Sequence, residues 1–179
     1  MSIQYETIPY QLSDSALSIP HQDKPELVHD DDPATSVMTD FGIVPPETIP
    51  EGANLDTAIH EIQGSNNHLL LVVNDNHHVQ GIITSADLLG SKPMQLMQKR
   101  GIQREKISVK MLMRPCEVIP VITLDEVAMA KVGNVVQTLH AAKRSHVLAI
   151  NENMQICGLF SAAQISKQLH RNIVINQED

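Results

Sequence analysis

An internal repeat with an offset of 77 residues constrains the fold of this chain more than any other feature. At that offset, segment 54–90 aligns with segment 131–167 without a gap. Each segment begins with apolar residues at positions i, i+3, i+4 and i+7, which predicts an amphipathic helix with one buried face. These residues are Leu55, Ala58, Ile59 and Ile62 in the first copy, and Val132, Val135, Val136 and Leu139 in the second.

Each predicted helix is followed by a pattern typical of a β-hairpin. A short apolar run, 69–73 or 147–150, leads into a turn rich in Asn, and a second apolar run follows at 79–83 or 156–160. Runs this short and continuous indicate buried strands. A second helix is predicted to begin near Thr84 and near Ser161. We also expect a short strand ahead of each copy, at Ile43-Val44 and at Val118-Ile119.

A unit of this size cannot bury both faces of its sheet alone, so we expect the two copies to pack together. The predicted organisation is an extended, proline-containing leader at 1–33, a first unit at 34–92, a linker helix within 93–107, a second unit at 108–172 and a tail at 173–179. Pro93 and Gly101 bracket the linker helix, as expected from helix start and stop preferences. Residues 120–130 are predicted to hold a small insertion, either a strand or a loop.

Composition excludes several classes of function. The chain has 13 basic and 21 acidic residues, a net charge of −8, and no Trp, so nucleic acid is an unfavourable partner. The first residues lack a basic segment followed by an apolar run, and we expect no signal peptide. No apolar stretch is long enough to span a membrane, and the expected location is cytoplasmic. Cys116 and Cys157 are expected to be free thiols.

Two motifs resemble the cystathionine-β-synthase (CBS) domain. Segment 81–89, Gly-Ile-Ile-Thr-Ser-Ala-Asp-Leu-Leu, is similar to the end of that domain, whereas segments 37–40 and 110–115 resemble the start of one. The similarity covers about residues 34–172 and implies a tandem pair of CBS domains, as in the stand-alone bacterial members. The implied fold is α/β (α+β), with two β-α-β-β-α units packed through their sheets around a pseudo-twofold axis.

The resemblance also implies a function. Such pairs commonly form homodimers and bind AMP, ADP, ATP or S-adenosylmethionine in clefts between the units. We therefore expect a non-catalytic regulatory module that requires no cofactor, senses an adenosine-type ligand and acts on an unknown regulated protein. The alternative is a ligand-independent dimeric scaffold with degenerate clefts. No arrangement of side chains suggests catalysis, and the His77-His78 pair lacks companions at metal-ligand spacing.

Thr84 and Asp87 are the leading candidates for ligand binding. In the family reading, Thr84 lies at a helix N-terminus that favours a phosphate, and Asp87 accepts hydrogen bonds from ribose hydroxyls. The alternative is purely structural, because Thr-x-x-Asp approximates a helix capping box. In the second copy Ser161 and Gln164 fit that capping box better still. Gln164 supplies no carboxylate, so the cleft beside Asp87 is the favoured one.

The same resemblance assigns the remaining candidates. His68 and His146 are expected near phosphates, with Arg144 as a further contributor, and Ser161 corresponds to Thr84. Leu69 replaces a residue that is often basic, which argues against tight binding of a polyphosphate. Val44 and Ile119 are each directly followed by a proline, and they are expected to line the slot for the adenine base.

Overall fold

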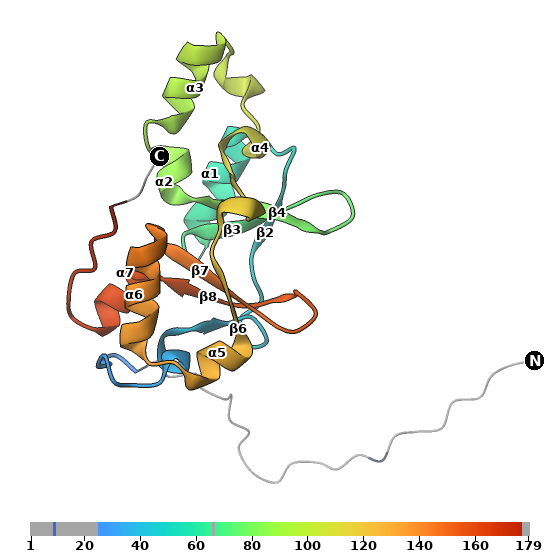
Figure 1. Cartoon of the computed structure of the whole chain (residues 1–179). Coiled ribbons are helices and arrows are strands. Elements are labelled where there is room, and N and C mark those ends of the chain that lie inside the picture. Colours follow the sequence, from blue (N-terminus) through green and yellow to red (C-terminus); the bar gives the residue numbers. More distant parts are fainter. Residues whose placement is uncertain (1–8, 10–24, 66, 177–179) are drawn as a thin grey trace, which may run out of the picture.

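Two four-stranded sheets with helices packed on them make up the chain (Figure 1). The structure is a computed structural model that describes residues 9, 25–65 and 67–176. The first sheet has the strand order β2-β3-β4-β5 and the second has the order β1-β8-β7-β6. We call each sheet with its helices a unit. The predicted fold class is confirmed, because each unit contains the expected β-α-β-β-α order.

The first unit is built from β2 (Thr48–Pro50), α1 (Leu55–Gly64), β3 (Leu69–Val73), β4 (Val79–Thr84), α2 (Ser85–Leu89), α4 (Val109–Leu112) and β5 (Arg114–Pro115). Helix α1 begins where the Asn54 side chain accepts a hydrogen bond from the amide of Thr57. Its predicted apolar face is buried through Leu55, Ala58 and Ile62. Helix α3 (Lys92–Arg100) and the 3₁₀ helix η2 (Arg104–Lys106) connect α2 to α4.

The second unit contains η1 (Ala34–Val37), β1 (Thr39–Asp40), η3 (Cys116–Val118), β6 (Val121–Thr123), α5 (Leu124–Met129), α6 (Val132–Ala142), β7 (His146–Ile150), β8 (Ile156–Ser161) and α7 (Ala162–Gln168). The insertion predicted within 120–130 is helix α5 rather than a strand or a loop, because β6 is the counterpart of β2 in the first unit. All four predicted apolar positions of α6 are buried. Their burial confirms the period-3.6 pattern read in the sequence.

The structural repeat extends to a local irregularity in the hairpins. In the first unit β3 and β4 pair antiparallel, with a register shift between Val72 and Val73. In the second unit β7 and β8 pair in the same way, with a shift between Ala149 and Ile150. These positions are 77 residues apart, so the two hairpins have the same irregularity at equivalent positions.

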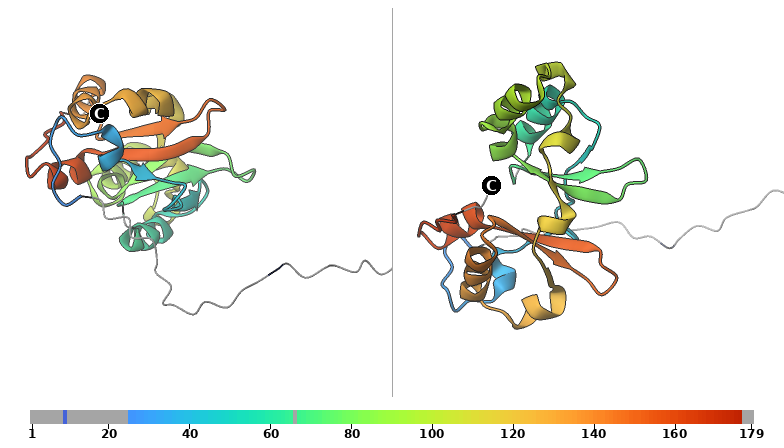
Figure 2. Two further views of the ribbon diagram at one scale, coloured as in Figure 1. Left: turned by 90° about the horizontal axis from the view of Figure 1, so that it is seen from below. Right: turned by 45° about the horizontal axis from the view of Figure 1, so that its top comes forward.

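The short strands at the sheet edges are exchanged between the units. Strand β1 precedes the first hairpin but pairs with β8, and β5 precedes the second hairpin but pairs with β4. Figure 2 shows the blue segment that contains β1 among the orange and red strands of the second unit. A glycine accommodates each exchanged strand. A Cβ atom at Gly81 would overlap the Arg114 carbonyl group, and one at Gly158 would lie 2.9 Å from the carbonyl oxygen of Thr39.

The strands predicted at Ile43-Val44 and Val118-Ile119 are wrong by a few residues. The first pair lies in a turn, and Val118 ends a 3₁₀ helix, whereas β2 and β6 begin at Thr48 and Val121. Both strands start after proline, which has no N–H to donate to a ladder. In each unit the strand then pairs in parallel with the first strand of the hairpin.

Part of the predicted leader belongs to the second unit. Residues 1–8 and 10–24 lie outside the described part of the chain, but residues 25–33 pack against α6 and α7. Val28 is 2% exposed in the core of this unit, and its amide donates to the Gln168 carbonyl group. Asp30 forms an ion pair with Arg171. Residues 25–33 are therefore structural rather than a free extension.

The two sheets face one another through a small apolar cluster. It combines residues of both hairpins: Leu69, Leu71, Ile82, Ile119, Leu148 and Leu159. Each unit has its own larger core on the helical face of its sheet. The contact between sheets brings the N-terminus of α2 in the first unit close to the start of β7 in the second.

Candidate functional site

The capping box predicted at the N-terminus of α2 is present and buried. Asp87 accepts hydrogen bonds at Oδ2 from the Thr84 backbone amide at 3.1 Å and from the Thr84 hydroxyl at 2.7 Å. The Asp87 amide donates to the Thr84 hydroxyl oxygen at 3.3 Å. Both residues are almost fully buried, at 5% and 4% exposure. The structural reading of Thr-x-x-Asp is therefore confirmed.

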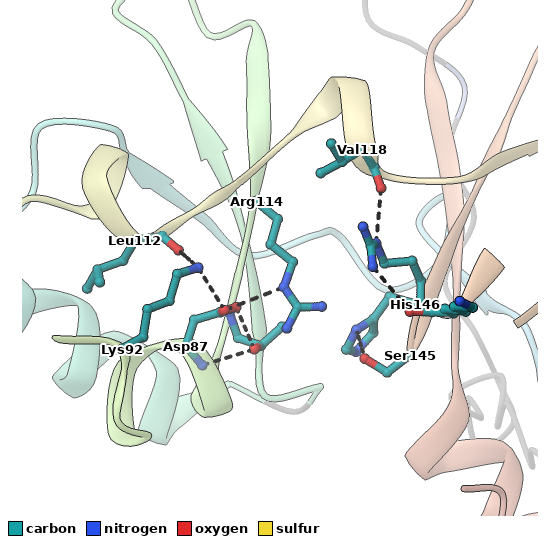
Figure 3. Close-up of polar contacts among 10 residues, drawn as sticks. Asp87, Lys92, Leu112, Arg114, Val118, Ser145 and His146 are labelled. Atoms are coloured by element: carbon teal, nitrogen blue, oxygen red, sulfur yellow. Dashed lines mark hydrogen bonds and ion pairs between the residues drawn. The ribbon is translucent and has the colours of Figure 1, made fainter. Parts of the chain in front are cut away.

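Two cations contact the other oxygen of the same carboxylate. Lys92 Nζ lies 3.2 Å from Asp87 Oδ1, and Arg114 Nε lies 3.4 Å from it. Lys92 also donates a hydrogen bond to the carbonyl oxygen of Leu112 (Figure 3). A carboxylate has about four acceptor positions, and the chain supplies four donors to Asp87. The chain itself therefore occupies both oxygens of this buried carboxylate.

His146 faces this cluster from the second unit. The pKa of His146 is lowered to about 4, chiefly by burial and also by the positive charge of Arg114, while the negative charge of Asp87 acts in the opposite direction. Its Nδ1 is 3.1 Å from the Ser145 hydroxyl oxygen. The imidazole is therefore neutral near pH 7. Figure 3 shows the Arg114 guanidinium on the side of Asp87 that faces His146.

The pseudo-equivalent positions on the other side of the molecule are neutral. Strand register aligns Thr39 with Arg114, and the repeat aligns Gln164 with Asp87. The Thr39 hydroxyl donates to Gln164 Oε1 at 3.2 Å, and Gln164 Nε2 donates to Gln168 Oε1 at 3.3 Å. A buried ionic pair at one position is thus replaced by a hydrogen-bonded neutral pair at the other.

The capping box predicted at Ser161 and Gln164 is wrong. The Ser161 side chain makes no capping hydrogen bond at the start of α7. Gln164 instead bonds to Thr39 on the exchanged strand β1, which the sequence pattern along one helix could not reveal. Ser161 is buried at this position.

The other predicted residues are spread around the junction of the units. The His68 backbone has φ 52°, and its carbonyl oxygen accepts from the Ser85 amide at 3.1 Å, next to the N-terminus of α2. Arg144 Nε donates to the Val118 carbonyl oxygen at 3.4 Å. Ile119 is buried between the sheets, whereas Val44 is exposed in the turn after β1.

Sequence reasoning missed Lys92 and Arg114 as members of the Asp87 cluster. Arg114 lies in the segment that resembles the start of a domain, and only its pairing with β4 carries it to Asp87. Lys92 is five residues beyond Asp87 in the sequence. A lysine in the first turn of a helix is unfavourable because its charge opposes the helix dipole. This unfavourable position was the one indication in the sequence that Lys92 has a specific acidic partner.

A surface hollow of about 430 Å³ lies elsewhere, over the N-terminal half of α6. Its charged side chains are held in two ion pairs, Lys131 with Asp31 and Arg171 with Asp30. It contains none of the predicted ligand residues. Among the residues that the structure describes, no three His, Cys, Asp or Glu side chains gather as a metal site. Within that same part of the chain, no helix has the length and apolar character needed to cross a membrane.

Comparison with known proteins agrees with this architecture. The family model of the CBS domain matches residues 34–92. A comparison with curated proteins gives no match. The chain is similar to an uncharacterized conserved protein from Pyrococcus horikoshii, with 17% identity, coverage of 82% of this chain and 98% of the other, and a TM-score of 0.57.

Two further solved structures share the fold. A hemolysin-like protein containing a CBS domain from Oenococcus oeni PSU has 18% identity, with 78% and 91% of the two chains covered and a TM-score of 0.56. The protein CBSX2, solved in complex with AMP, has 16% identity, with 76% and 94% covered and a TM-score of 0.53. The predicted resemblance is confirmed, by the family model for residues 34–92 and by fold for the pair.

Proposed function

From the premise that this chain carries a CBS domain at residues 34–92 and a second unit of the same fold, we propose that it is a non-catalytic regulatory module. The ligand is of the adenosine type, namely AMP, ADP, ATP or S-adenosylmethionine, and binds between the units on the side of Asp87. The observation that carries the proposal is the meeting of the two units at one polar site, where the buried Asp87 and the half-buried Arg114 of the first unit lie close to the half-buried His146 of the second. A histidine whose pKa is shifted by burial and by specific charged neighbours is more often found at functional sites than elsewhere.

The proposed contacts assign one part of the ligand to each residue. Asp87 receives ribose hydroxyls, the N-terminus of α2 at Thr84 and His68 approaches the phosphates, and His146 and Arg144 approach them from the second unit. Val44 and Ile119 are proposed to line the slot for the base. Ser161 takes the role of Thr84 on the neutral side, where weaker binding is expected because Gln164 offers no carboxylate.

Ligand binding between the units is proposed to regulate another protein by changing how the two units are arranged. A ligand that contacts both units favours one relative arrangement of them, with a coupling of about 1–3 kcal/mol. A regulated protein then responds to that arrangement. We propose a cytoplasmic homodimer as the working form, and AMP bound to CBSX2 supports an adenosine ligand by analogy.

A second candidate function is a ligand-independent dimeric scaffold. One observation favours it: the chain itself fills the hydrogen-bonding positions of both sites, through four donors to Asp87 and through the Thr39–Gln164 bond. In this reading the polar groups hold the units in one fixed arrangement.

Thermal melting separates the two candidates. A ligand at about 100 times its dissociation constant stabilises the folded state by about 2.7 kcal/mol. The melting temperature should therefore rise with the concentration of at least one of AMP, ADP, ATP and S-adenosylmethionine. Titration calorimetry well below the melting temperature should then show loss of binding in Asp87→Asn and little change in the matched variant Gln164→Ala. No shift with any compound at millimolar concentration would favour the scaffold.

A further inference from the structure

Lys92 makes two contacts that tie separate segments of the first unit together. Its ammonium group lies 3.2 Å from Asp87 Oδ1 and donates to the Leu112 carbonyl oxygen at the end of α4. The residue opens helix α3, where a positive charge opposes the helix dipole and no acidic side chain lies in the first turn. The local helix therefore gains nothing from this lysine, and its contacts with Asp87 and Leu112 account for its position.

A ligand hydroxyl can reach Asp87 only by replacing one of the present donors. The two Thr84 donors belong to the buried capping box, and the Arg114 side chain is 19% exposed on a paired strand. The Lys92 side chain is 42% exposed and has a long flexible stem. Water can solvate the Lys92 ammonium group when it leaves, because that side chain is partly exposed, so Lys92 is the donor that leaves at the least cost.

Release of Lys92 also removes a hydrogen bond from Leu112. Leu112 ends α4 and is followed within two residues by β5, which carries Arg114. The segment from Leu112 through η3 to β6 runs from the first unit into the second. Loss of this contact would therefore loosen the connection through which one unit acts on the other.

We propose that Lys92 is an internal competitor for Asp87 that holds the ligand-free state. A ligand hydroxyl displaces it, and the displacement frees the end of α4. The inference deepens the function proposed above and rests on it as far as the ligand is concerned. The clamp on Leu112 stands without any ligand.

The test uses Lys92→Met, which keeps the apolar stem and removes the charge, and Lys110→Met as the matched control. Lys110 is also an exposed lysine with one carboxylate partner, Glu51, and it lies on α4 itself. The probe is adenosine, which has ribose hydroxyls but no phosphate to be attracted by a lysine. Calorimetric affinity for adenosine should rise about two- to fivefold in Lys92→Met and stay unchanged in Lys110→Met. Equal or weaker binding in Lys92→Met would overturn the competition.

Amide hydrogen exchange tests the clamp without a ligand. Peptides covering residues 109–115 should exchange faster in Lys92→Met than in the wild type or in Lys110→Met. Unchanged exchange would overturn the clamp. If no adenosine compound binds the wild type or Lys92→Met, the proposed function and the competition both fail, while the exchange result still decides whether Lys92 holds α4.

Discussion

Replacement of His146 by leucine should remove a stability loss that begins when the pH falls below neutral. The repeat itself suggests this substitution, because Leu69 occupies the corresponding position of the first unit. Folding lowers the His146 pKa from about 6.5 to about 4, chiefly because the imidazole is buried and also because Arg114 is nearby. The unfolded chain therefore binds a proton at this residue more readily than the folded chain does.

The sign and size of the effect follow from linkage. Between pH 6.5 and 4 the unfolded state is protonated at His146 and the folded state is not, so stability falls as the pH falls, by up to about 1.4 kcal/mol per pH unit. From pH 7.5 to pH 5 the loss is about 2 kcal/mol, and about 1 kcal/mol when the remaining solvent contact of the ring is allowed for. The effect is complete below about pH 4, where both states are protonated.

Urea unfolding of the wild type and His146→Leu at pH 7.5, 6 and 5 measures this effect. Carboxylates that titrate in the same range contribute equally to both proteins and cancel in the difference. The wild type should lose about 1–2 kcal/mol more than the variant between pH 7.5 and 5. A difference that stays constant over this range would refute the reasoning, because it would mean that the folded state accepts the proton without cost.

Two further predictions concern the frame that holds the site. Gly81→Ala should destabilise the protein by about 1–3 kcal/mol, because its Cβ would overlap the Arg114 carbonyl group of β5. In the control Gly52→Ala, the added Cβ meets nothing within 4 Å, so this variant should be nearly as stable as the wild type. Equal melting temperatures of the two variants would contradict the close approach of β5 to Gly81. Val28→Ala should cost about 2 kcal/mol in chemical denaturation, since Val28 is 2% exposed, and Leu27→Ala, at 53% exposed, should change stability by less than about 0.5 kcal/mol. Equal costs for the two substitutions would mean that residues 25–33 do not pack as described.

The repeated core was predictable because hydrophobic periodicity is a local signal. The buried faces of α1 and α6 and both hairpins follow from spacing alone, and the capping box at Thr84 and Asp87 follows from two residues in one turn. The short edge strands were misplaced because their position depends on proline and on pairing with the hairpins. Single short strands carry little pattern of their own.

The polar site was predictable only in part. Asp87 and His146 were identified from the resemblance, but several of the side chains that contact them come from other segments. Arg114 contacts Asp87 because β5 pairs with the sheet of the first unit. Gln164 accepts a hydrogen bond from Thr39 on β1 instead of capping its own helix. Contacts that depend on such long-range pairing have no signature in one segment of sequence.

The exchange of β1 and β5 also bears on the order in which a growing chain can be completed. Strand β1 is synthesised early, yet its partner β8 emerges only after the whole of the first unit and most of the second. Until then β1 has no partner within its own chain, and an unpaired strand is a condition that favours pairing with a neighbouring chain whose β8 is already complete. Two nascent copies could therefore trade their β1 strands, and slow synthesis or high local concentration should increase the fraction of such interlinked products.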